Sequence, residues 1–343
     1  MQKLFGSTLV RHLVLAALAC VGLYVVTVSI SPYRNLQLAT VALYACAAAG
    51  LTVLIGHSGQ ISLGHGAFMA VGAYMSALMM IHQRLPLPVA LLTSVAVTAA
   101  LGALVGVAAA RLHGPYLAGA TLSIAIAAPA VANYETFSAL LGGHNGLSVP
   151  TRPAPLILGP MFPLERWLAW VTCLATVVTF VLLANATRSR FGRELRAVRD
   201  DEVAAELAGI RLGRMRVLAF VVSAACAGLA GALLAVVTSL AAPGAFGLGL
   251  SLTLLAVVVL GGLGSLTGAV LGAVVLVLLP SWSTDLAQRL GLSQDVYGNF
   301  PLAVYGLVLI VLMLAGSHGV VGVLRTLRAV VSSRWPVRTS DPS

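Results

Sequence analysis

The side chains that most often perform catalysis or bind metals are few in this sequence, and their spacing suits neither task. His57 and His65 stand eight positions apart without an acidic neighbour, and no H-E-x-x-H motif occurs, so no metal site is expected. Ser265 lies in a glycine-rich stretch, but Leu263 stands where a G-x-S-x-G nucleophile elbow needs glycine. No catalytic triad or carboxylate pair can be assembled, so we expect no enzyme and no catalytic residues.

Lysine and cysteine usage excludes further chemistry. Lys3 is the only lysine among the 20 basic residues. A phosphate-binding loop of the G-x-x-x-x-G-K-[ST] type requires a lysine after its glycine, so the chain has no ATP-binding motif of that type. Apolar stretches without C-x-x-C spacing contain the four cysteines, which are Cys20, Cys46, Cys173 and Cys226. Neither a disulfide scaffold nor zinc is therefore expected, and we expect no cofactor.

The composition indicates a membrane protein. Of 343 residues, 59% are apolar and only 9% are charged, whereas soluble domains carry roughly 25% charged residues. A helix of about 20 apolar residues spans a bilayer, and the apolar stretches accommodate ten such helices. They lie at about 13–30, 37–55, 66–82, 88–110, 116–133, 167–184, 217–240, 302–317 and, interrupted by a glycine-rich break, 251–280. We predict an all-α polytopic bundle of about ten helices that forms a single domain, 1–343.

Basic residues predict the orientation, because they are retained on the cytoplasmic side. If the amino terminus is cytoplasmic, 15 Lys and Arg lie on that side and 5 on the other. Ten crossings then place both termini inside. The tail, 317–343, is expected to anchor on inner-leaflet lipid. The net charge of +10 is explained in this way, and no nucleic-acid partner is expected.

The apolar segments contain no Asp, Glu, Lys or Arg. Ionisable residues inside membranes usually mark proton relays and ion paths, so their absence argues against proton coupling. A sodium site built from carbonyls and hydroxyls, or a passive channel, stays open as an alternative.

Glycine-rich breaks interrupt the apolar pattern at two places. Non-helical backbone at membrane depth occurs only where it is buried in protein or lines a cavity, and such breaks point to a substrate path. The first break, 56–66, predicts path residues Ser58, Gln60, Ser62, Gly64 and His65. The alternative is an ordinary polar turn at the cytoplasmic surface.

The second break contains Gly264, Gly268 and Gly272, whose spacing of four predicts one helix face for close packing. Its weak similarity to 56–73 is consistent with an internal repeat.

Two connections on the predicted outer side are long. Tyr134–Arg166 contains five prolines and is expected to form an irregular cap. Ser281–Phe300 is expected to form a short surface helix.

The loop 188–216 holds 13 of the 30 charged residues. We predict a helix over Gly192–Ala208 that Gly209 ends. A short amphipathic helix of this type docks on a partner or lies on the membrane surface. The alternative is a solvated loop whose arginines only fix the topology.

Five sequence stretches resemble a known family; three of them are short motifs within 114–122, 142–147 and 261–269. The run E-V-A-A-E-L-A-G-I over 202–210, preceded by G-R-E-L-R-A-V-R-D over 192–200, is similar to the coupling loop of ABC-importer membrane subunits, more narrowly branched-chain amino acid permeases of the LivM type. G-H-S-G-Q-I-S-L-G-H-G-A-F over 56–68 is similar to that family's most recognisable motif. The resemblance covers about 35–280. Departures at Ser123–Ala127 and Leu141 put the substrate, more than the fold, in question.

The resemblance implies a permease of the bacterial inner membrane with a coupling helix. The residues that would contact an ATPase are Arg196, Asp200, Glu202, Ala204, Ala205, Glu206, Gly209 and Ile210. It further implies a second, LivH-like permease subunit, two cytoplasmic ATPase subunits and a periplasmic or extracellular binding protein. The implied substrate is a branched-chain or other apolar amino acid. Urea or short amides, and an autonomous secondary transporter or channel, stay as alternatives.

Overall fold

The computed structural model describes residues 8–112, 114–150, 153–155, 158–159, 161–291 and 300–315. Its long helices are α1 (Thr8–Ser29), α2 (Pro32–Thr52), α3 (His65–Ile81), α4 (Leu87–Ala109), α5 (Pro115–Asn133), α7 (Leu164–Arg188), α10 (Leu212–Thr238), α11 (Leu248–Gly261), α12 (Leu266–Arg289) and α14 (Phe300–Ala315). The predicted tail, 317–343, lies outside the described residues.

The prediction of an all-α membrane bundle is confirmed. Each of the ten predicted apolar segments overlaps one of these helices. Seven spans among the described residues are long and apolar enough to cross a bilayer, while α3 and the apolar part of α1, Val14–Ser29, are shorter.

Two helices form the centre of the bundle. Within their most apolar windows, α2 is 83% buried and α10 is 72% buried, whereas the other five spans are at most 39% buried. Small residues allow this close packing. A Cβ on Gly50 of α2, for example, would lie 2.5 Å from the Cβ of Cys226 on α10.

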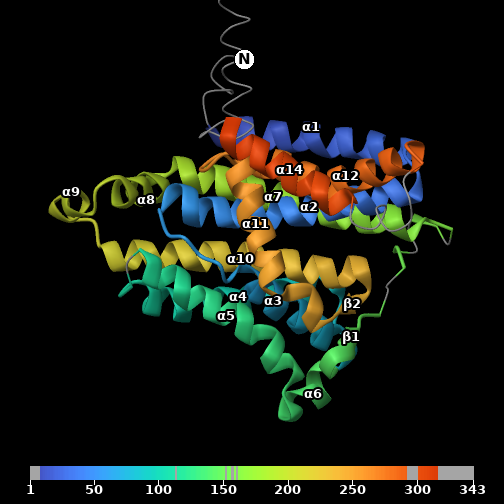
Figure 1. Cartoon of the computed structure of the whole chain (residues 1–343), viewed down its shortest axis with the longest axis horizontal. Coiled ribbons are helices and arrows are strands. Elements are labelled where there is room, and N and C mark those ends of the chain that lie inside the picture. Colours follow the sequence, from blue (N-terminus) through green and yellow to red (C-terminus); the bar gives the residue numbers. More distant parts are fainter. Residues whose placement is uncertain are drawn as a thin grey trace, which may run out of the picture.

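The two ends of the bundle differ (Figure 1). At one end lie the short helices α8 (Arg190–Asp200) and α9 (Glu202–Leu207), with α9 projecting beyond the long helices. At the other end, β1 (Leu147–Ser148) pairs antiparallel with β2 (Leu240–Ala241), Leu147 opposite Ala241 and Ser148 opposite Leu240. The connection before α7 also contains α6 (Glu135–Leu141) and the short turn η3 (Gly143–Asn145), and the one after α10 contains η5 (Pro243–Phe246).

The expectation of a separate surface helix over Ser281–Phe300 is wrong for its first half, because α12 continues to Arg289. Pro280 does not end the helix. The hydroxyls of Ser283 and Thr284 donate to the carbonyls of Leu279 and Pro280, 2.7 and 2.9 Å away, and Ala287 is buried. Residues 292–299 lie outside the described residues.

Candidate functional site

The charged loop forms two helices, so the prediction of one helix over Gly192–Ala208 is wrong. Asp201 adopts an extended backbone, with φ −156°, between α8 and α9. Its carboxylate accepts a hydrogen bond from the amide of Ala204, 3.0 Å away. Aspartate is a favoured N-cap residue because it satisfies an amide that the first helical turn leaves free, so the chain starts a new helix here.

Helix α9 presents apolar side chains to its surroundings. Val203 and Leu207 are 70% and 85% exposed, whereas Ala205 is buried. Gly209, with φ +82°, ends the helix, and the amide of Ile210 donates to the carbonyl of Ala205 at 3.0 Å. This is a glycine-dependent C-terminal turn. A projecting helix with exposed apolar residues at a charged end of the bundle is suited to docking on a partner.

The predicted coupling residues lie on α8, on α9 and directly after α9. Arg196 is half-buried and donates to the carbonyl of Thr187 at 3.0 Å. Asp200 forms an ion pair with Arg199, and Glu202 forms one with Arg216. Ala205 is buried on the inner face of α9. Asp200, Glu202, Ala204, Glu206 and Gly209 are exposed, and Ile210 is half-buried.

Arginines of this region donate to carbonyls near the ends of three bundle helices. Arg196 donates to Thr187 near the end of α7. Arg216, which is buried, donates over 3.1 Å to the carbonyl of Ala110, directly after α4. Arg199 donates to Gly56, 2.5 Å away. Arg199 and Arg216 were not among the predicted site residues. The concentration of arginines in the loop could have indicated such contacts, but the sequence does not show which arginines donate to helix ends.

The first glycine-rich break begins with a π-helix, η2 (Val53–His57), that extends α2. Residues 58–64 are irregular, and α3 starts at His65. Ser58, Gln60 and Ser62 are all buried. The side-chain Nε2 of Gln60 donates to the Ser58 hydroxyl and, over 3.5 Å, to the carbonyl of Arg216. The break therefore lies against the start of α10, close to the charged loop.

His65 belongs to a buried polar chain between helices. Its Nε2 lies 3.0 Å from the Ser223 hydroxyl, which donates to the carbonyl of Gly50 at 2.8 Å. Because the serine proton is used in that bond, we assign the His65 proton to Nε2. Nδ1 then accepts no hydrogen bond. Gly64, directly before it, lies against Thr121 of α5, whose carbonyl oxygen would be 3.1 Å from an added Cβ.

The second break is a turn between α11 and α12. Gly268 and Gly272 lie on α12, and a Cβ on either would overlap the backbone of α11 at Gly261 or Val257. Gly264 precedes α12 and has φ +81°. The prediction that all three glycines share one helix face is therefore wrong for Gly264, which instead contacts the backbone of Gly56.

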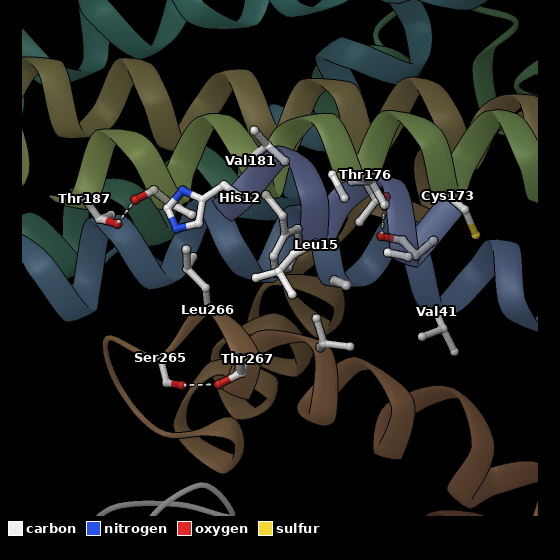
Figure 2. A pocket seen from close by; sticks show the side chains of 18 of the residues that line it. His12, Leu15, Val41, Cys173, Thr176, Val181, Thr187, Ser265, Leu266 and Thr267 are labelled. Atoms are coloured by element: carbon white, nitrogen blue, oxygen red, sulfur yellow. Dashed lines mark hydrogen bonds between the residues drawn. The ribbon is translucent and has the colours of Figure 1, made fainter. Parts of the chain in front are cut away.

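A groove of about 680 Å³ opens between α1, α2, α7 and the start of α12 (Figure 2). Most of its lining is apolar, including Leu15 and Val41; His12 and Thr187 lie toward one end, and Thr176 lies toward the other. Nδ1 of His12 is 2.9 Å from the amide oxygen of Asn185. None of the five predicted path residues lines this groove. No cluster of metal ligands occurs among the described residues.

Comparison with known proteins gives a consistent family. Residues 34–316 match the family model described as the permease component of the branched-chain amino acid transport system. The high-affinity branched-chain amino acid transport permease LivM of Salmonella typhimurium is 33% identical over 296 residues, 79% of this chain and 68% of that protein. LivM of Escherichia coli is 34% identical over 251 residues, 66% of this chain and 58% of that protein.

LivH of Salmonella typhimurium, also a branched-chain amino acid permease, is 28% identical over 247 residues, 68% of this chain and 79% of that protein. No solved structure matches.

Proposed function

Because this chain belongs to the family of branched-chain amino acid transport permease components, we propose that it is the membrane-spanning subunit of an ABC importer. The family consists of transport permeases rather than enzymes. The proposed cargo is a branched-chain or other apolar amino acid, by analogy with the relatives' names. The proposed permease domain is the whole chain, 1–343.

The observation that supports this proposal best is the projecting helix α9. Its exposed Val203 and Leu207 provide an apolar contact, and Glu206 provides a charge, at the most charged end of the bundle. The chain has no lysine-containing phosphate loop of its own. We infer that α8 and α9 dock into an ATPase subunit that supplies the energy.

The orientation that we propose puts α8, α9 and both termini in the cytoplasm of a bacterial inner membrane. Arginines concentrate at the α8–α9 end, as the positive-inside rule requires. The β1–β2 end would then face a periplasmic or extracellular binding protein. Similarity to both LivM and LivH supports pairing with a second permease subunit.

The proposed path residues are Ser58, Gln60, Ser62, Gly64 and His65. Their support is the non-helical backbone that carries the first four, together with the free Nδ1 of His65. Unwound backbone of this type offers amides and carbonyls to a small polar ligand group.

The test is reconstitution of the chain with the proposed second permease subunit, the two proposed ATPase subunits and the proposed binding protein. We expect radiolabelled leucine to accumulate only with ATP on the α9 side. Unlabelled valine should compete, and urea or acetamide should not; competition by urea would reassign the cargo. Concentrative uptake by the chain alone under a proton or sodium gradient would refute the ABC assignment.

Two substitutions test the docking helix. We expect Glu206→Ala and Gly209→Val to leave membrane insertion intact and to uncouple ATP hydrolysis from uptake. Gly209→Asn is the matched control, because asparagine tolerates the positive φ better than valine does. Uptake per ATP equal to wild type in Gly209→Val would exclude this role for α9.

A further inference from the structure

The end of α2–η2 is held by an arginine from the charged loop. The last carbonyls of a helix lack partners within the helix and carry its negative dipole end. Gly56 is one of the last residues of η2, and its carbonyl oxygen accepts a hydrogen bond from Nη1 of Arg199. Arg199 lies on α8, 143 positions away in sequence. The contact therefore joins α8 directly to the first glycine-rich break.

The same arginine is fixed on two further sides. Its Nε and Nη2 donate to the Asp200 carboxylate at 2.9 and 2.7 Å, which orients the guanidinium. A Cβ added to Gly59 would lie only 2.9 Å from the Cγ of Arg199, so the aliphatic part of the arginine contacts that glycine. Arg199 is thus in contact with both Gly56 and Gly59 of the break.

Gly56 also contacts the second glycine-rich break. A Cβ on Gly56 would overlap the backbone nitrogen and Cα of Gly264, so the two glycines meet backbone to backbone. Glycine has no side chain, so no rotamer change at this contact could absorb a displacement. Close-packed interiors transmit strain. A movement of Gly56 must therefore move Gly264 or separate the two turns.

We propose that Arg199 is the positioning residue that connects a movement of α8 to both glycine-rich breaks together. Arg199 pulls on the carbonyl of Gly56, and Gly56 displaces the turn between α11 and α12. The two breaks then move as one element in response to the docking helices. This inference rests on the proposed function, in which α8 and α9 receive the movement of an ATPase.

The test compares ATP hydrolysis and leucine uptake in the same proteoliposomes containing the full complex. Arg199→Gln removes the charge, and we expect hydrolysis to stay near wild type while uptake per ATP falls about ten-fold, as loss of a charge-assisted hydrogen bond implies. Arg199→Lys keeps a cation and an N–H for Gly56, and should recover part of the coupling. Arg289→Gln is the matched control, because Arg289 lies in the last turn of α12, outside the docking helices α8 and α9.

The outcomes separate the two proposals. If the wild-type complex shows no ATP-driven uptake, the proposed function fails and this inference falls with it. If wild type transports and Arg199→Gln couples equally well, only the connection through Arg199 is refuted. A proportional loss of hydrolysis and uptake with a lower melting temperature would show a purely structural role and would also refute it. If Arg199→Gln does not assemble, Arg199→Lys decides. Partial coupling in Arg199→Lys supports the connection through Arg199. Coupling equal to wild type, or no coupling, refutes it.

Discussion

Nη1 of Arg199 lies 2.5 Å from the carbonyl oxygen of Gly56, so a residue of the charged loop caps the helix at the centre of the bundle. This contact gives a structural role to both the charged loop and the first glycine-rich break. The loop is more than a carrier of charges that fix topology, because its arginines hold helix ends. The break at Gly56 is more than an interruption of α2, because it lies between the loop and the turn at Gly264.

Gly56→Ala should destabilise the fold. The new methyl group would overlap the backbone of Gly264, and overpacking of this kind costs about 1–3 kcal/mol or more. The control is Gly119→Ala on α5, where a Cβ meets nothing within 4 Å and alanine is the better helix former. Reversible unfolding of the purified chain in mixed micelles measures both free energies. Equal values for the two variants would contradict the close approach.

Asp201→Ala should loosen α9. Loss of the N-cap hydrogen bond to Ala204 costs about 1 kcal/mol, which corresponds to about five-fold faster amide exchange in the helix. Asp201→Asn keeps a side-chain oxygen for the amide and should exchange like wild type. Hydrogen exchange resolved by mass spectrometry checks this for the peptide covering α9. If Asp201→Asn exchanged as fast as Asp201→Ala, the effect would come from the lost charge and the capping role would be contradicted.

Thr176→Val should weaken the contact between α7 and α2. The Thr176 hydroxyl donates to the carbonyl of Ala42 at 2.9 Å, and both residues line the groove. Interhelical hydrogen bonds in membranes are worth about 0.6–1.7 kcal/mol. Thr253→Val is the control, because Thr253 bonds within its own helix to Gly249. The free energy of unfolding in micelles should fall for the first variant only.

Thiol labelling should distinguish Cys20 from the other cysteines. Cys46, Cys173 and Cys226 are buried, whereas Cys20 is only half-buried on the outer helix α1. Buried thiols react slowly because the reagent cannot reach them. A membrane-permeant maleimide should therefore add first at Cys20, and Cys20→Ser should abolish the fast phase. Intact mass measures the additions, with four expected after unfolding in detergent. Fast addition at Cys46 would contradict its place in the core.

The predicted helix positions agree well with the structure because transmembrane helices follow a rule that is local in sequence. A run of about 20 apolar residues must form a helix in lipid, where every backbone group needs an internal partner. The stop at Gly209 was also predictable, since a glycine with positive φ ends helices locally. The break at Asp201 was missed, because its charged surroundings favour one amphipathic helix and the local cap decided otherwise.

The sequence by itself determined that this chain is a membrane bundle of the branched-chain amino acid permease family, and which loop concentrates its charge. Only the tertiary structure decided that Arg199 and Arg216 donate to carbonyls at helix ends, that Gly264 contacts Gly56 instead of sharing the α12 face, and that His65 lies beside Ser223. The physical reason is the range of the interactions. Apolar runs, caps and glycine turns act over a few residues, whereas these contacts join positions that the packing of separate helices brings together.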